Sequence, residues 1–161
     1  MTIAIGEKLP AATLRLVEPE GTRDVAVDEF FAGRKIVLFG LPGAFTPTCH
    51  KNHLPGFIAN EDAFKAKGVT QIAMTSVNDP HVLRAWGKAT GAEGRIAFLS
   101  DGNGAFAREV GLSIDMAGGY MGVRSKRYAM LVDDGKVTRL NIEDSPGKAD
   151  VSGAEALLAQ I

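Results

Sequence analysis

The chain has 161 residues, 45% of them hydrophobic, and a formal net charge of −1 at pH 7. This length suits a single core, so we expect residues 1–161 to form one domain. No long uncharged apolar run is present, which argues against a membrane span. The near-neutral charge gives no general attraction to nucleic acid or to an anionic membrane.

The first half of the chain predicts buried strands with a helix between them. Residues 35–40 and 70–77 are short apolar runs of the kind found in the middle of an α/β sheet. Residues 47–67 should form a helix that begins at Pro47, where a missing N–H has no consequence. Pro55-Gly56 should kink this helix, because proline cannot donate the hydrogen bond that an interior helical position needs.

A second helix is predicted after Asp79-Pro80. Asp79 can cap this helix and Pro80 can occupy its first position, while Gly91 should end it. Residues 96–99 have the pattern of a third buried strand, and residues 104–110 that of a short helix.

The C-terminal part predicts a hairpin and a last helix. Residues 127–132 and 136–142 flank Asp134-Gly135, a two-residue turn typical of β-hairpins. Ser152 and Glu155 have the spacing of a capping box that would open the last helix. This order of elements predicts an α/β protein with a thioredoxin-like fold, in which helices flank a central mixed β-sheet.

The start of the chain and its single cysteine bear on location. Residues 1–6 show no basic start followed by an apolar block, so we expect no secretion signal. Cys49 is the only cysteine and cannot form an internal disulfide, which suits a reducing compartment. We therefore expect a cytoplasmic protein.

Cys49 is also the residue most indicative of chemistry. It ends the string Pro42-Gly43-Ala44-Phe45-Thr46-Pro47-Thr48-Cys49, at the expected first turn of a helix. Free N–H groups and the partial positive charge of a helix start favour a thiolate, and an accessible thiolate is a nucleophile. A nearby cation is also needed, and Arg127 is the best candidate. Thr46 can bring its hydroxyl to the sulfur or to a substrate oxygen.

The pattern Pro42-x-x-x-Thr46-x-x-Cys49 resembles the active-site signature of the peroxiredoxins. The longer string from Gly40, followed by His53-Leu54-Pro55-Gly56-Phe57, resembles their type II (class V, atypical) branch, as do residues 76–79, 85–87 and 126–128. The resemblance covers nearly the whole chain. It implies a thioredoxin-like fold and a thiol-dependent peroxidase without a cofactor. It also implies a peroxidatic Cys49, with Thr46, Arg127 and Pro42 lining the pocket.

Some relatives carry a second, resolving cysteine at the position of Val151. Because this chain has none, the resemblance implies a 1-Cys enzyme whose sulfenic acid is resolved by an external thiol. Glutathione, glutaredoxin and thioredoxin are the candidates, and the expected substrates are hydrogen peroxide and small alkyl hydroperoxides. A homodimer is also implied, with Phe45, Pro47 and Asp79-Pro80 as contacts.

We expect further residues to line the substrate pocket, namely Pro47, Phe45, His53, Tyr120 and Met121. The last two belong to the glycine-rich residues 118–122, which we expect to be mobile. Arg124, Lys126 and Arg127 form a basic cluster that is typical of a solvated turn and does not predict nucleic-acid binding.

Two other functions stay open. In one, oxidised Cys49 signals to a partner protein, so that the chain is a redox sensor. In the other, His53 is the general base of a Cys-His hydrolase. Cys49, His50 and His53 could also suggest a metal site, but they lack a fourth ligand and we expect no metal.

Overall fold

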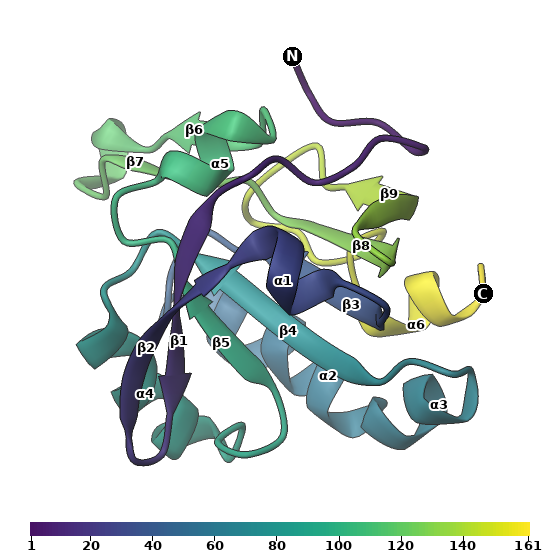
Figure 1. Ribbon diagram of the computed structural model, residues 1–161. Coiled ribbons are helices and arrows are strands. Elements are labelled where there is room, and N and C mark those ends of the chain that lie inside the picture. Colours follow the sequence, from purple (N-terminus) through teal and green to yellow (C-terminus); the bar gives the residue numbers. More distant parts are fainter.

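The computed structural model describes residues 1–161 and is built around a seven-stranded sheet with the order β2-β1-β5-β4-β3-β8-β9 (Figure 1). The strands are β1 (Thr13–Glu18), β2 (Gly21–Ala26), β3 (Lys35–Gly40), β4 (Gln71–Ser76), β5 (Ala97–Ser100), β8 (Tyr128–Asp133) and β9 (Lys136–Ile142). Strands β3, β4 and β5 are parallel, whereas β1 and β8 pair antiparallel with β5 and β3. The sheet is therefore mixed, and the predicted thioredoxin-like fold is confirmed.

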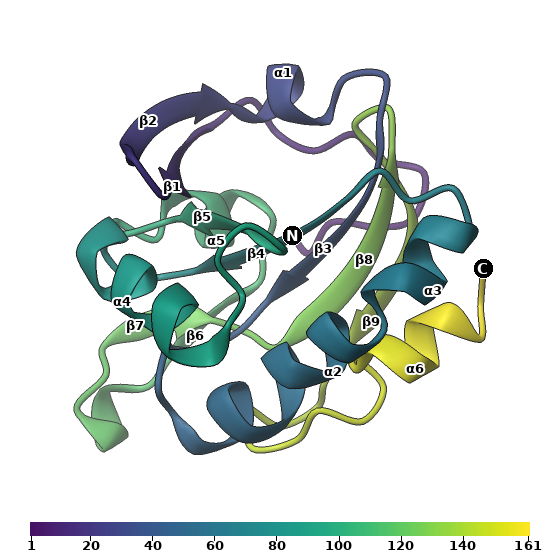
Figure 2. The same ribbon diagram turned by 90° about the horizontal axis from the view of Figure 1, so that it is seen from below.

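Helices cover both faces of this sheet (Figures 1 and 2). The helices are α1 (Val27–Phe31), α2 (Leu54–Ala59), α3 (Glu61–Ala66), α4 (Pro80–Thr90), α5 (Ala105–Glu109) and α6 (Ala154–Leu158). One apolar cluster joins the sheet to α2, α3, α4 and α6, and a second joins the opposite face to α1 and α5. No helix is long and apolar enough to cross a membrane.

The buried strand β3 shows why the core has two halves. Successive side chains of a strand point to opposite faces, so Val37 and Phe39 enter one cluster while Ile36 and Leu38 enter the other. All four side chains are fully buried. The prediction of a strand covered on both faces, made from this run of apolar residues, is thus confirmed.

Two local predictions are confirmed in atomic detail. The Asp79 carboxylate accepts hydrogen bonds from the N–H groups of His81 and Val82, and Gly91 ends α4 in a left-handed conformation. The hairpin turn between β8 and β9 places Asp134 and Gly135 at φ of 50° and 79°. Positive φ at both central residues is what a tight hairpin turn requires.

The helix expected over residues 47–67 is present, with an interruption at Asn60 and a π-helical segment, η1 (Cys49–His53), before Pro55. The predicted capping box, in contrast, is wrong. Gly153, and not Ser152, is the N-cap of α6, and no side chain caps the helix. The Ser152 hydroxyl, which was the expected cap, donates to Glu143 at 2.6 Å instead.

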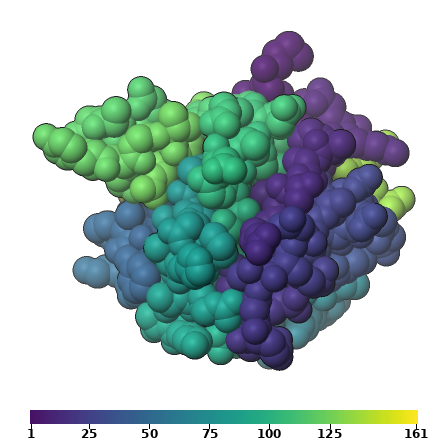
Figure 3. Space-filling view, turned by 60° about the vertical axis from the view of Figure 1, so that its left-hand side comes forward, coloured from purple at the N-terminus to yellow at the C-terminus, as the bar shows by residue number.

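Four features of the fold are not among those that the sequence predicts: β1, β2, α1 and a small second sheet. This second sheet pairs β6 (Ser113–Asp115) with β7 (Val123–Ser125), and the short 3-10 turn η2 (Ala117–Gly119) lies between them. We call residues 113–125 the β6–β7 arm. It projects from the body of the molecule in the space-filling view (Figure 3).

Candidate active site

Cys49 lies at the start of the helix that follows β3. Pro47 and Thr48 are already helical, so Cys49 is within the first turn, as the sequence predicts. The turn has an irregular pattern, because the Leu54 N–H donates to the Cys49 carbonyl five residues earlier. Pro55 follows this turn and has no N–H to continue a regular ladder. π-helical turns are rare and occur frequently at functional sites.

The Cys49 side chain is completely buried, with 0% of its surface exposed. The expectation of an accessible thiol is therefore wrong for this conformation of the chain. The sulfur belongs to the apolar cluster beneath α2, α4 and α6. Apolar surroundings alone disfavour a negative charge, so a charged sulfur at this place needs a neighbouring cation.

Arg127, the residue before β8, supplies that cation. Its Nη2 donates to the Cys49 sulfur over 3.1 Å, and the residue is only 2% exposed. Its Nε and Nη2 also donate to the Pro146 carbonyl at 3.1 and 2.8 Å. The guanidinium forms no ion pair with a carboxylate. A buried cation without an acidic partner favours an anion beside it, and the sulfur of Cys49 is the atom that it contacts.

His53 is held by hydrogen bonds to Arg127 and to Ser152, a residue just before the last helix. Its Nδ1 accepts from Arg127 Nη1 at 3.1 Å, and its Nε2 lies 2.9 Å from the Ser152 carbonyl. A guanidinium only donates and a carbonyl only accepts, so the ring is neutral and carries its hydrogen on Nε2. Burial lowers the pKa of His53 to about 3; the bond to Ser152 opposes this shift and the charge of Arg127 adds to it.

This arrangement leaves neither ring nitrogen of His53 free to take a proton from Cys49. A Cys-His hydrolase needs a base with an open nitrogen beside the nucleophile. The geometry therefore argues against the hydrolase interpretation.

Thr46 and Pro42 belong to the loop between β3 and the helix. The Thr46 hydroxyl donates to the Gly43 carbonyl at 2.6 Å. The backbone carbonyl of Thr46 accepts from the His50 N–H. Pro42 is buried, and its carbonyl accepts from Arg124 Nη1 at 3.2 Å. The hydrogen of the Thr46 hydroxyl is thus used within the loop, while its oxygen keeps a lone pair for a further donor.

Arg124 in β7 is a neighbour of the site, whereas its sequence pattern predicts a residue of a solvated cluster. It is half-buried, and its Nε donates to the Met121 carbonyl at 2.7 Å. A Cβ added to Gly43 would lie 2.8 Å from Arg124 Nη1 and 3.2 Å from Met121 Cε. Met121 and Arg124 therefore pack closely against the active-site loop and join it to the β6–β7 arm.

The other expected pocket residues lie nearer the surface. Phe45 is 51% exposed and stacks on the His50 ring at 5.8 Å, and the Trp86 indole donates to His50 at 2.9 Å. Pro47 is exposed in the first helical turn. Tyr120 is 99% exposed at the end of η2, and the structure does not bring it into the group around Cys49.

The segment between β9 and α6 borders the site, although no sequence pattern predicts it there. Its carbonyls accept from Arg127 at Pro146, from Thr48 at Gly147 and from His53 at Ser152. No sequence signal marks these positions, because every residue carries a backbone carbonyl.

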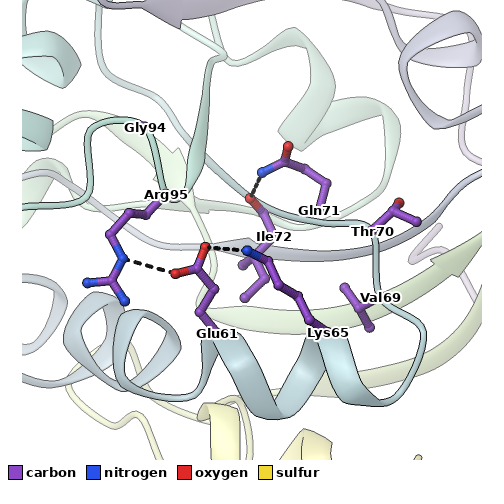
Figure 4. Close-up of a pocket in the computed structure, with 8 residues that line it drawn as sticks. All are labelled: Glu61, Lys65, Val69, Thr70, Gln71, Ile72, Gly94 and Arg95. Carbon is purple, nitrogen blue, oxygen red and sulfur yellow. Dashed lines mark hydrogen bonds and ion pairs between the residues drawn. The ribbon is translucent and has the colours of Figure 1, made fainter.

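A polar cavity of about 110 Å³ lies elsewhere, beside α3 (Figure 4). Glu61 accepts from Arg95 at 2.9 Å and pairs with Lys65 at 3.3 Å, so the charged groups at this cavity satisfy one another. Its lining contains no cysteine or histidine. No cluster of three or more histidine, cysteine, aspartate or glutamate side chains is placed to hold a metal ion.

Comparisons with known proteins show the family to which the chain belongs. The family model Redoxin matches residues 4–158. The chain is 45% identical to peroxiredoxin-2C of Oryza sativa subsp. japonica, over 97% of this chain and 96% of the relative. It is 49% identical to chloroplastic peroxiredoxin-2E-2 of the same plant, over 98% of this chain and 72% of the relative.

Among solved structures, reduced Prx3 of Vibrio vulnificus in complex with H2O2 is similar, with a TM-score of 0.93 and 50% identity over 99% of each chain. Near-complete coverage and identities of this size leave no part of the fold unaccounted for. The buried thiol with its guanidinium partner lies in a chain that belongs to the peroxiredoxins of the Redoxin family, which are thiol peroxidases.

Proposed function

We propose that this chain reduces hydrogen peroxide and small alkyl hydroperoxides as a 1-Cys enzyme of the type II (class V) branch. The observation that carries the proposal is the 3.1 Å contact between Arg127 Nη2 and the sulfur of Cys49, the only cysteine. The relative from Vibrio vulnificus, whose complex holds hydrogen peroxide, supports the substrate class by similarity.

The proposed reaction begins with attack of the Cys49 thiolate on the outer oxygen of the hydroperoxide. The S–O bond forms as the O–O bond breaks, which gives a sulfenic acid and an alkoxide that takes a proton from solvent. Negative charge spreads over the sulfur and both oxygens, and Arg127 is placed to stabilise it. Thr46 is proposed to orient the peroxide through the free lone pair of its hydroxyl. Pro42 is proposed to shield the sulfur from over-oxidation.

The return half of the cycle needs a thiol from outside the chain. One external thiol condenses with the sulfenic acid, releasing water and forming a mixed disulfide, and a second thiol reduces that disulfide. Glutathione, glutaredoxin and thioredoxin are the candidate reductants. We also propose that the chain works in the cytoplasm, where such thiols keep a lone cysteine reduced.

The test is a peroxide-consumption assay of the parent chain with each reductant in turn, compared with Cys49→Ser. We expect sustained turnover with at least one reductant and none in the variant. Undiminished turnover by Cys49→Ser would remove the proposed mechanism. One stoichiometric oxidation without turnover, with all three reductants, would instead favour a redox sensor.

We further propose a homodimer that pairs through the loops around the site. Phe45 supports this proposal because it exposes half of a large apolar surface beside the exposed Pro47. Asp79 and Pro80, at the start of α4, are the other proposed contacts.

A further inference from the structure

The segment from Glu143 to Ser152, which joins β9 to α6, accepts hydrogen bonds from three residues near Cys49. Its Pro146 carbonyl accepts two bonds from Arg127, and its Gly147 carbonyl accepts one from Thr48 at 3.1 Å. Its Ser152 carbonyl accepts from His53 at 2.9 Å. We call residues 143–152 the cradle segment.

A single buried carboxylate holds the two ends of the cradle segment together. Glu143 Oε2 accepts from the Ser152 N–H at 2.8 Å and from the Ser152 hydroxyl at 2.6 Å. Glu143 is 8% exposed, Ser152 is fully buried, and Glu143 forms no ion pair. A buried carboxylate without a cation depends on such donors for its stability, so these two bonds are held firmly.

The same residue is also tied to the catalytic guanidinium through the backbone. The Glu143 N–H donates to the Arg127 carbonyl at 3.0 Å. Glu143 therefore fixes the main chain of Arg127 directly and its side chain indirectly, by way of Ser152 and His53. The indirect path runs from Glu143 to Ser152, from the Ser152 carbonyl to His53, and from His53 Nδ1 to Arg127 Nη1.

From these contacts we infer that Glu143 and Ser152 are positioning residues for the thiol chemistry of Cys49. They keep His53 in its neutral Nε2–H form and hold the Pro146 carbonyl in place, and these two acceptors aim Arg127 Nη2 at the sulfur. Neither residue forms a hydrogen bond with Cys49. The inference rests on the role proposed above for Arg127, and it assigns the orientation of that residue to the C-terminal part of the chain.

The orientation matters because an arginine must face the sulfur to be useful. A guanidinium is a flat fork, and its hydrogen bonds depend on the angle as well as on the distance. The Pro146 carbonyl accepts from Arg127 directly, and the Ser152 carbonyl holds the His53 ring that accepts from it. If both carbonyls were displaced, Arg127 would keep its charge but lose its contacts with Pro146 and His53, which fix its plane. Misplacement of a charged donor by about 1 Å can reduce a rate about 10²-fold.

The test compares Glu143→Ala with Asp144→Ala. Asp144 is the next residue, its side chain is 81% exposed, and its pair with Lys148 spans 3.6 Å, so its loss should change little. We expect Glu143→Ala to lower kcat/KM for hydrogen peroxide by about 10-fold or more. Glu143→Gln keeps an acceptor for Ser152 and should recover most of the rate.

A second readout does not need peroxide at all. The rate of Cys49 alkylation by iodoacetamide, measured against pH, reports how well Arg127, the charged group that contacts the sulfur, favours the thiolate, while His53 stays neutral behind it. We expect the pH at which the alkylation rate rises to be higher in Glu143→Ala than in the parent, and to be unchanged in Asp144→Ala. Lower stability alone would change the melting temperature but not this profile for the folded fraction.

Ser152→Ala keeps the chain testable if Glu143→Ala fails to fold, because it removes one hydrogen bond and leaves the Ser152 backbone contacts. A smaller shift in the same direction, with recovery in Ser152→Thr, would support the inference. Alkylation profiles and peroxide rates equal to those of Asp144→Ala, in folded Glu143→Ala or Ser152→Ala, would overturn it. A parent chain that reduces no peroxide would instead refute the proposed function, while the alkylation profile would still test the positioning role.

Discussion

Arg127 and Cys49 are 78 residues apart in the chain, yet Nη2 of the arginine lies 3.1 Å from the sulfur of the cysteine. The same guanidinium also donates to His53 and to the Pro146 carbonyl. One side chain thus carries charge to the sulfur and receives its own orientation from two neutral acceptors. Such a donor needs no reorganisation when negative charge develops beside it.

This contact predicts different outcomes for two substitutions of Arg127. Arg127→Ala removes the donor and should lower kcat/KM for hydrogen peroxide by about 10²–10³-fold. Arg127→Lys keeps a positive charge but lacks the flat fork that reaches His53, Pro146 and Cys49 together. Its kcat/KM should therefore lie between those of the parent and of Arg127→Ala. Stopped-flow peroxide reduction measures both, and an Arg127→Ala rate equal to that of the parent would contradict the prediction.

The pKa of His53 predicts how stability depends on pH. Burial lowers that pKa from its ordinary value of 6.5 to about 3 in the folded chain. Between these two values only the unfolded chain binds the proton, so the free energy of unfolding falls as the pH decreases from 6.5 toward 3. One such group contributes at most about 1.4 kcal/mol per pH unit.

The variant His53→Gln cannot take up that proton. Its free energy of unfolding, measured by urea titration at several pH values, should therefore depend less steeply on pH in this window than that of the parent. Equal slopes for parent and variant would show that His53 does not titrate differently in the folded and unfolded chains.

Gly40, the last residue of β3, predicts a strongly destabilising substitution. A Cβ at this position would lie 2.6 Å from Tyr128 Cζ and 2.9 Å from Ser125 Oγ. Tyr128 is 1% exposed and cannot move aside, so Gly40→Ala should lower the free energy of unfolding by about 1–3 kcal/mol or more. Gly56→Ala is the matched control. No atom lies within 4 Å of its added Cβ, and alanine favours helix by up to about 1 kcal/mol.

The proposed dimer predicts a native mass about twice the 17.0 kDa of the chain in analytical ultracentrifugation. Phe45→Arg places a charge in the proposed contact and should shift the mass toward that of a monomer. Ile5→Arg, a change at an apolar residue that is 60% exposed outside this contact, should leave the dimer intact. A parent chain of strictly monomeric mass would refute the dimer.

Elements governed by signals a few residues long were predictable from the sequence. Asp79, Pro80 and Gly91 define the ends of α4 because capping and left-handed glycine act within one helical turn. Asp134-Gly135 sets its hairpin for the same kind of reason. The strand β1 is not among the predicted elements, although its buried Leu14 and Leu16 alternate with exposed side chains, which is the usual signal of a half-covered strand.

Elements governed by distant partners were not predictable in this way. Ser152 has the spacing of a helix cap, but its hydroxyl donates to Glu143 because that buried carboxylate needs donors. Arg124 looks like part of a solvated turn, yet the Pro42 carbonyl on another element accepts from it. In both cases a local preference is outweighed by a hydrogen bond that exists only once the chain is packed.

The sequence by itself indicated which atom is the candidate nucleophile, because a helix start, a threonine and a lone cysteine lie within a few residues of one another. Tertiary structure alone decided that the sulfur is buried, that His53 is a neutral acceptor, and that the distant Pro146 carbonyl accepts from Arg127. These features depend on contacts between residues up to 99 positions apart, as between His53 and Ser152. Such contacts are fixed by how the strands and helices pack, since no local propensity encodes them.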